Sequence, residues 1–212
     1  MFLNLKSHRK FTMCLRALPI NAAGGTGDIA LKVAAQNRFN ASITVVDVNE
    51  AMLEVGKRKQ LEHNLAHKDV NWTVGDAENL NFESDTFDVY TIAFGIRNCT
   101  HVDQVLSEAF RVLRSGGRFY CLEFGRVQNP LLRRLYDEYS FQVIPVMGHL
   151  IAGDMQSYRY LVESIRRFPD QESFKTMIES SGFEEAQYEN LSNGICAVHT
   201  AVKPRRRKMD GN

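Results

Sequence analysis

A glycine-rich turn followed by an acidic strand end is the feature that most constrains this chain. The turn, Ala22-Ala23-Gly24-Gly25-Thr26-Gly27-Asp28, opens a helical pattern, and the next apolar run ends at Asp47, twenty positions after Gly27. This spacing is typical of a βαβ unit that holds a nucleotide-like ligand. Glycines let the backbone approach a ligand closely, and a helix N-terminus directs free N–H groups at it. Because a carboxylate at the second strand end can accept hydrogen bonds from a ribose diol, we expect a ribose-bearing cofactor.

Length and composition fit one domain with a sizeable core. The 212 residues carry 26 Lys and Arg against 25 Asp and Glu, so an overall positive electrostatic field that would attract nucleic acid is not expected. No apolar run approaches the roughly 18 residues that a membrane-spanning helix needs. The four cysteines are scattered without a CxxC pair, which indicates free thiols in a reducing compartment and neither a disulfide framework nor a metal site.

The two ends of the chain are basic. Residues 1–20 contain no acidic residue, which is typical of a mitochondrial targeting segment; a frayed or degraded first strand is the alternative. Residues 204–212 include Arg205-Arg206-Arg207-Lys208 and are expected to form a solvated tail, with a nuclear or anionic-lipid role as the lesser alternative.

Between these ends, apolar periodicity predicts alternating strands and helices. Expected strands are Leu15 to Asn21, Ser42 to Asp47, Val70 to Val74, Phe87 to Phe94, Arg118 to Phe124, Ala186 to Leu191 and Ile195 to Val202. Expected helices are Thr26 to Asn37, Asn49 to Ala66, one capped by Thr100 and stopped by Ser115-Gly116-Gly117, and one from Pro169-Asp170 to Gly182.

This order predicts an α/β fold with a mostly parallel seven-stranded sheet. Ser192-Asn193-Gly194 between the last two strands indicates an antiparallel C-terminal hairpin. Residues 129–168 interrupt the alternation with aromatic and charged residues, and they are expected to form a helical insert in a domain spanning 21–203. The ligand should lie at the carboxyl ends of the parallel strands, near the point where the strand order reverses.

The glycine turn favours a mononucleoside over a dinucleotide. It lacks the GxGxxG pattern, so a pyrophosphate is not expected, whereas S-adenosylmethionine (SAM) suits a shorter turn. Gly75-Asp76-Ala77 at a third strand end could place Asp76 on the adenine amino group; the alternative is that Asp76 only caps a turn.

Candidate catalytic side chains are few. Arg97, in Phe94-Gly95-Ile96-Arg97-Asn98 after the fourth strand, is expected to face the substrate, where it could orient an oxygen or a water; a surface charge is the alternative. Glu123 reads as a polar residue at the lip of the site. His101 and His149 have no second ligand at metal spacing, so no metal is expected.

At these motifs the chain resembles the ubiquinone/menaquinone C-methyltransferases of the UbiE type, most like their eukaryotic mitochondrial members. The resemblance runs from about Ala23 to Lys203. It is carried by Ala23-Gly24-Gly25-Thr26-Gly27-Asp28, Asp47-Val48-Asn49-Glu50-Ala51-Met52-Leu53, Gly75-Asp76-Ala77-Glu78, Phe94-Gly95-Ile96-Arg97-Asn98, Leu122-Glu123-Phe124, Tyr139-Ser140-Phe141-Gln142-Val143-Ile144-Pro145 and Ser157-Tyr158-Arg159-Tyr160-Leu161-Val162-Glu163-Ser164-Ile165-Arg166.

The resemblance implies a class I SAM-dependent methyltransferase fold and methylation of a ring carbon of 2-polyprenyl-6-methoxy-1,4-benzoquinol in ubiquinone biosynthesis. It implies cofactor contacts from Gly25, Thr26, Gly27, Asp47, Asp76, Ala77 and Ala93, with Arg97 as the catalytic candidate. It also implies other coenzyme Q biosynthesis proteins as partners and a peripheral position on the matrix side of the mitochondrial inner membrane.

The chain departs from the family pattern at its start. The family's helical segment before the first strand is not seen, and Asn21 stands where the family has an Asp, so an N-terminally truncated member is expected. Two alternatives follow: a non-catalytic scaffold member of the coenzyme Q assembly, and an NAD-dependent oxidoreductase. The missing GxGxxG and the antiparallel hairpin speak against the second.

Overall fold

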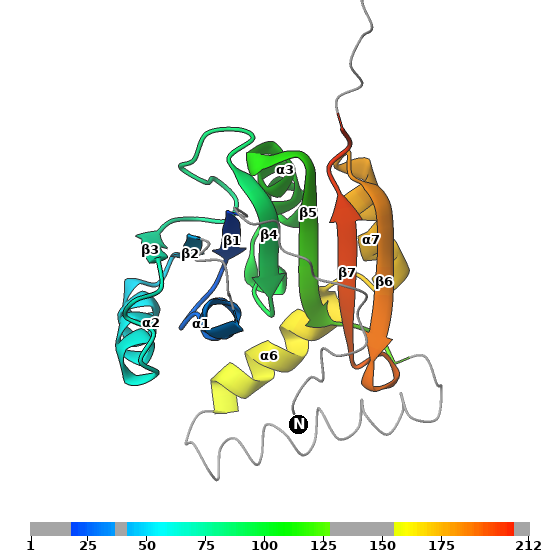
Figure 1. Cartoon of the computed structure of the whole chain (residues 1–212). Helices are drawn as coiled ribbons and strands as arrows, with labels where there is room; N and C mark the ends of the chain where they lie inside the picture. Colours follow the sequence, from blue (N-terminus) through cyan, green and yellow to red (C-terminus); the bar gives the residue numbers. More distant parts are fainter. Residues whose placement is uncertain (1–17, 37–41, 128–154, 206–212) are drawn as a thin grey trace, which may run out of the picture.

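In the computed structural model, which describes residues 18–36, 42–127 and 155–205, seven strands form one sheet in the order β3-β2-β1-β4-β5-β7-β6 (Figure 1). The strands are β1 (Pro19–Ala22), β2 (Ile43–Asp47), β3 (Val70–Val74), β4 (Phe87–Ala93), β5 (Leu113–Phe124), β6 (Glu184–Leu191) and β7 (Cys196–Val202). The helices are α1 (Asp28–Gln36), α2 (Glu50–Glu62), α3 (Val102–Val112), α6 (Met155–Arg167) and α7 (Gln171–Ser180), with short 3-10 turns η2 (Ile96–Asn98) and η4 (Ser192–Gly194).

The strand pairing confirms the predicted sheet. β1 to β5 pair in parallel, whereas β7 is antiparallel to both β5 and β6. The strand order reverses between β1, which continues to β2 and β3, and β4, which continues to β5. Two strands that diverge in this way leave an opening at their carboxyl ends, where a ligand can bind.

Two apolar layers cover the sheet. On one face Ala30 and Ala34 of α1 and Leu53 of α2 pack against Ile43 and Val45 of β2. The larger core buries side chains of β4 and β5 under α3 and α7; its fully buried members include Tyr90, Phe119, Phe174, Leu106 and Ile178. α6 crosses near the carboxyl ends of β4 and β5 (Figure 1).

Trp72 of β3 fixes the start of α1 against α2. A Cβ atom on Gly27 would lie 2.4 Å from its ring, and one on Gly56 would lie 2.3 Å from it. The indole Nε1 donates to Gln60 Oε1 at 2.9 Å, which holds the ring in place. Both glycines are therefore required where helix backbone and indole meet.

Both predicted boundaries of α3 were wrong. His101, not Thr100, is the N-cap of α3, and it makes no side-chain capping bond. Glu78 explains the difference, because its carboxylate accepts hydrogen bonds from the backbone N–H groups of both Thr100 and His101. α3 ends at Val112, so Ser115-Gly116-Gly117 does not stop it; these residues lie in β5, where the register with β4 shifts and Gly116 N–H donates to the Lys203 carbonyl.

The predicted C-terminal hairpin is confirmed, and it closes the sheet at the β6 edge. Its turn, Ser192-Asn193-Gly194, has three consecutive residues with positive φ.

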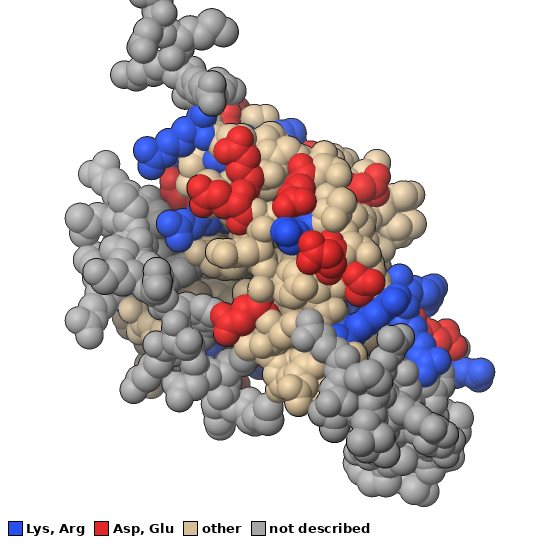
Figure 2. Space-filling model, turned by 90° about the vertical axis from the view of Figure 1, so that its right-hand side faces the viewer, with Lys and Arg blue, Asp and Glu red and all other residues tan. Residues whose placement is uncertain are grey.

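The β6 edge of the sheet is charged. Figure 2 looks onto this side of the molecule, where acidic side chains are frequent. β6 contributes Glu184, Glu185 and Glu189, all exposed, and such charges discourage another chain from pairing with an open strand edge.

The remaining domain predictions concern the ends and the insert. Residues 1–17 and 206–212, and residues 128–154 of the expected insert, lie outside the described residues. The end of the insert region is helical as α6. The weak first strand forms, and Pro19 stands at its start, where the missing N–H is tolerated.

Candidate cofactor and substrate site

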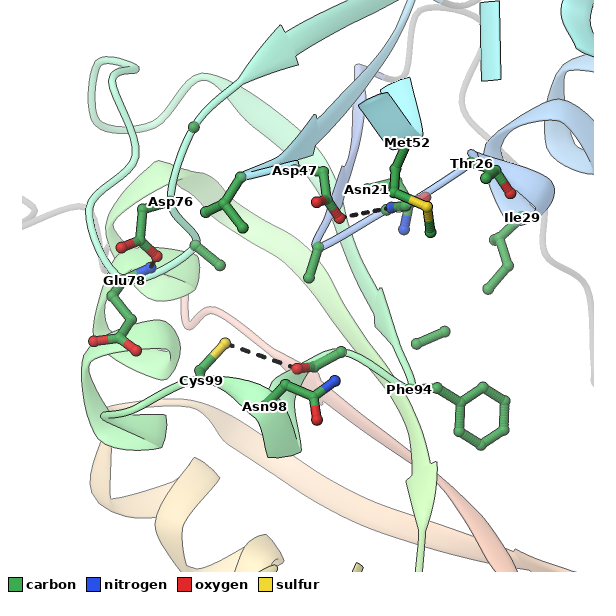
Figure 3. Close-up of a pocket in the computed structure, with 18 of the residues that line it drawn as sticks. Asn21, Thr26, Ile29, Asp47, Met52, Asp76, Glu78, Phe94, Asn98 and Cys99 are labelled. Carbon is green, nitrogen blue, oxygen red and sulfur yellow. Dashed lines mark hydrogen bonds between the residues drawn. The ribbon is translucent and has the colours of Figure 1, made fainter. Parts of the chain in front are cut away.

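A pocket of about 610 Å³ opens at the carboxyl ends of β1 to β4 (Figure 3). It is lined by Asn21, Ala23, Gly24, Gly25, Thr26, Asp28 and Ile29 around β1, by Asp47, Val48 and Met52 after β2, by Gly75, Asp76, Ala77 and Glu78 after β3, and by Ala93, Phe94, Gly95, Asn98, Cys99 and Thr100 after β4. The pocket therefore lies where the reversal of strand order predicts it.

The glycine turn and the end of β2 are joined through Asp47. Its Oδ2 accepts the Gly25 N–H at 2.8 Å and its Oδ1 accepts the Asn49 N–H at 2.9 Å. A Cβ on Gly24 would lie 2.6 Å from a Val45 methyl group, so this glycine allows the turn to pass close over β2. Each carboxylate oxygen keeps a further lone pair, which leaves Asp47 able to accept hydrogen bonds from a diol in the pocket.

Thr26 is held at the pocket wall by a lysine from α2. Lys59 Nζ donates to Thr26 Oγ1 at 2.8 Å and to Asp28 Oδ1 at 2.9 Å. Burial opposes the ionisation of Asp28, but hydrogen bonds from Lys59 and Thr26 outweigh it and lower the pKa of this carboxyl. The start of α1 is thus tied to α2 by polar bonds as well as by Trp72.

Asp76 caps the turn after β3 and also lines the pocket, so the predicted adenine contact stays a prediction. Its Oδ1 accepts the Glu78 N–H at 2.9 Å, which caps the turn, and the residue also lines the pocket with buried Ala77. Glu78 then bonds the His101 ring at 2.8 Å. Burial opposes the charge of Glu78, yet hydrogen bonds from His101 and Thr100 lower its pKa, so this carboxylate ties the loop after β3 to the start of α3.

Cys99 lines the pocket as a protonated thiol. Its Sγ lies 3.8 Å from the Gly95 carbonyl oxygen (Figure 3). Burial, helped by the negative charges of Glu78 and Asp76, raises the pKa of Cys99 to about 11. Because the thiolate is the nucleophile, this cysteine is not poised for covalent chemistry at neutral pH.

Arg97 and Glu123 lie beside the pocket and are paired with each other. Arg97 Nη1 is 3.0 Å from Glu123 Oε1 and also donates to the Phe94 carbonyl, and its guanidinium carbon stands 5.1 Å from the centre of the Phe124 ring. Both side chains are almost fully enclosed, so Arg97 is not a surface charge and Glu123 is not a lip residue. Burial raises the pKa of Glu123, and the charge of Arg97 opposes that rise.

Six of the eight predicted site residues line the one pocket: Gly25, Thr26, Asp47, Asp76, Ala77 and Ala93. Gly27 lies behind it against Trp72, and the Arg97 side chain faces Glu123. The sequence analysis did not single out Ile29 and Met52, and it named Phe94 and Asn98 only as part of the segment that contains Arg97. Their signal was position alone, since each lies in the loop or first helical turn that follows a strand.

Within the described ranges, no group of three or more His, Cys, Asp or Glu side chains is placed to hold a metal ion. Over the same residues, no helix has the length and apolar character needed to cross a membrane.

Solved structures with this fold include methyltransferases. A SAM-dependent methyltransferase from Thermotoga maritima aligns with a TM-score of 0.62 at 19% identity, covering 89% of this chain and 82% of that one. A phosphoethanolamine N-methyltransferase 2 from Haemonchus contortus, in complex with S-adenosylhomocysteine (SAH), gives 0.68 at 16% identity, covering 92% and 50%. The expected class I SAM-dependent methyltransferase fold is therefore confirmed.

Curated relatives are much more similar in sequence. The mitochondrial 2-methoxy-6-polyprenyl-1,4-benzoquinol methylase of Mus musculus is 62% identical over 160 residues, covering 76% of this chain and 49% of the relative. The Arabidopsis thaliana protein of the same name is 50% identical over 200 residues, covering 87% and 69%. The chain thus spans about half the length of the first of these relatives. The model of the ubiE/COQ5 methyltransferase family matches residues 6–203, so this chain belongs to the ubiE/COQ5 methyltransferase family.

Proposed function

We propose that this chain is a SAM-dependent C-methyltransferase that methylates a ring carbon of 2-polyprenyl-6-methoxy-1,4-benzoquinol in ubiquinone biosynthesis. The observation that carries the proposal is the pocket itself. In a member of this family, the glycine turn, Asp47 and Asp76 converge on one cavity at the reversal of strand order. Relatives named as methylases of this quinol support the reaction and give no support to the scaffold alternative.

The lining residues suit SAM as the cofactor. Asp47 offers carboxylate lone pairs for the ribose diol, and Asp76, with buried Ala77 beside it, offers an acceptor for the adenine amino group. Val48 and Met52 add exposed apolar surface at the same end, where a planar base can pack. Gly25 and Thr26 line the cavity at the start of α1, and Ala93 contributes a small wall at the end of β4. Gly27 supports this site from behind by packing on Trp72.

Few catalytic side chains are needed for this reaction. When bound, SAM would supply an electrophilic methyl group on a positively charged sulfur. An electron-rich quinol carbon would take this methyl group, with S-adenosylhomocysteine as the leaving group, and the ring proton would then pass to water or another base. The protein must hold the reacting ring carbon in line with the methyl group and the sulfur and must exclude water, so positioning supplies much of the rate enhancement. The contacts of Arg97 support a role in fixing the segment from Phe94 to Asn98. A direct contact between Arg97 and a substrate oxygen stays a prediction; a guanidinium acts there as a charge and a donor.

We further propose that the protein works in the mitochondrion, at the matrix face of the inner membrane, with other coenzyme Q biosynthesis proteins as partners. The mitochondrial names of the relatives support the compartment. A polyprenyl substrate is dissolved in lipid, so an enzyme that uses it must work at a membrane surface.

The test is a calorimetric titration of the full 212-residue chain with SAH, followed by a methylation assay on a short-prenyl methoxybenzoquinol. Micromolar SAH binding and a singly methylated product by mass spectrometry are expected. A folded chain that binds no SAH would refute the proposal, and SAH binding without methyl transfer would refute its catalytic part. Binding of NADH in place of SAH would favour the oxidoreductase alternative.

A further inference from the structure

Phe94 has a backbone conformation that a phenylalanine rarely adopts. Its φ is +53°, in the left-handed region, which is unfavourable for a bulky side chain. The strain is held from both sides, because Phe94 N–H donates to the Leu122 carbonyl at 2.8 Å and the Phe94 carbonyl accepts from Arg97. Strained residues that the surroundings hold in place occur most often at functional sites.

Glycine would relieve this strain, and the chain uses glycine at the next position. A Cβ on Gly95 would lie 2.6 Å from Ala23 Cβ, so close packing of the two strand ends requires glycine there. Ala23 itself has a φ of +45° at the end of the neighbouring strand. The strained position nevertheless carries a large aromatic side chain, which indicates that the ring is needed for something other than backbone geometry.

The ring is available to a ligand. Phe94 lines the pocket and is 37% exposed, unlike the enclosed rings of the core. One neighbour is Phe124, whose centroid is 4.9 Å away. In Figure 3 the Phe94 ring lies at the opposite end of the view from Asp76 and Glu78, so it is remote from the acidic end of the site.

We infer that Phe94 is a specificity residue whose ring forms a wall for the aromatic ring of the methyl acceptor. This rests on the proposed function and deepens it by naming the residue that recognises the acceptor. Phe94 presents an apolar ring at the end of the pocket that lies away from Asp76, and Phe124 packs against this ring at 4.9 Å from outside the pocket lining. Aromatic pairs at such distances attract beyond simple burial. The Arg97–Glu123 pair keeps this surface in place by holding the Phe94 carbonyl and the η2 turn.

The test compares Phe94→Gly, Phe94→Leu and Phe94→Tyr in the full chain. Tyr160→Leu is the matched control, because Tyr160 is a half-exposed aromatic residue of α6 outside the pocket lining. The readouts are the KM for a short-prenyl methoxybenzoquinol, SAH affinity, the urea midpoint, and calorimetric binding of the corresponding quinone in the presence of SAH.

Phe94→Gly and Phe94→Leu are expected to raise the quinol KM about tenfold, with SAH affinity changed less than twofold. Phe94→Gly should not lower the urea midpoint, since it also relieves strain, and Phe94→Tyr and Tyr160→Leu should retain wild-type binding. Unchanged quinol KM and quinone binding in Phe94→Gly and Phe94→Leu would overturn the inference. So would a parallel loss of SAH affinity, which would indicate a cofactor or structural role.

Different results would refute the role of Phe94 and the proposed methyl transfer. If the wild-type chain binds SAH and transfers no methyl group, the proposed reaction fails, while the quinone titration still compares Phe94 variants with wild type. If methylation proceeds and the Phe94 variants match the wild type, only the inference fails.

Discussion

The guanidinium of Arg97 and the carboxylate of Glu123 form an ion pair between η2 and the end of β5, with Nη1 3.0 Å from Oε1 and the two side chains 9% and 1% exposed. Glu123 also accepts the Phe124 N–H at 2.8 Å. The pair therefore joins the strand that ends beside the pocket to the segment that lines it.

Removing one partner of this pair should be costly. Glu123→Ala leaves a buried guanidinium without its counter-charge, and a loss of about 3–5 kcal/mol in unfolding free energy is expected. The double variant Arg97→Met/Glu123→Leu, which replaces charge by apolar volume, should recover most of that loss. Urea unfolding of the single and double variants measures both. A cost below about 1 kcal/mol for Glu123→Ala would match an exposed pair and contradict the burial.

Asp47 should govern affinity for the cofactor. Asp47→Ala removes the acceptor proposed for the ribose diol and also frees the Gly25 N–H, so SAH binding should weaken at least about tenfold. Calorimetric titration measures the SAH dissociation constant of each protein. Asp103→Ala, an exposed aspartate on α3 outside the pocket, is the control and should leave SAH affinity unchanged. Equal affinity of Asp47→Ala and wild type would remove Asp47 from the site.

Gly56→Ala should reverse the usual effect of this substitution in a helix. Alanine in a helix interior is ordinarily favoured over glycine by about 1 kcal/mol. Here the new methyl group would meet the Trp72 ring, which Gln60 holds in place, so a destabilisation of about 1–3 kcal/mol is expected. In a Trp72→Leu background the cost of the same change should fall, although the Thr26 carbonyl oxygen, 3.0 Å from the new methyl group, remains. Urea midpoints of the four proteins form the double-mutant cycle, and stabilisation by Gly56→Ala alone would rule out the contact.

Protonation of His199 should weaken the fold in mildly acidic solution. Burial lowers its pKa, partly opposed by its hydrogen bond with the Gln171 carbonyl at 2.9 Å, so the folded state favours the neutral ring. The stability that this group contributes is complete above its unfolded pKa of about 6.5, and it is lost as pH falls from there through the lower folded pKa. Urea midpoints measured from neutral pH downward should fall less steeply for His199→Gln than for wild type. Identical slopes would mean that other groups carry the acid sensitivity.

The strands and the pocket position could be predicted because they depend on short local patterns. Asp47 and the glycine turn stand a fixed distance apart in a βαβ unit, and any such unit brings them together. The Arg97–Glu123 pair could not be predicted in this way, because its residues come from different elements and only the packing of β4 beside β5 makes them neighbours.

The incorrect boundaries have the same origin. Thr100 has the right residue type for a helix cap, but Glu78, from the loop after β3, supplies the acceptor and shifts the start of α3 to His101. Gly27 reads as a ligand-contacting glycine in the sequence, whereas the structure packs it on Trp72, far along the chain. The residue types indicated that Thr100 and Gly27 have a specific role, but only their neighbours in the folded chain show which role each has.

The placement of β7 between β5 and β6 has a consequence for how the protein is made. β6 leaves the ribosome before β7, yet β6 pairs only with β7, so it has no sheet partner until the last strand emerges. Lys203, just beyond β7, then reaches back to Asp85 at 2.8 Å. The two strands beyond β5 can therefore join the sheet only after β7 has been translated. A nascent chain halted before Cys196 would expose the edge of β5 and leave β6 without any pairing partner, which makes early termination a hazard for aggregation.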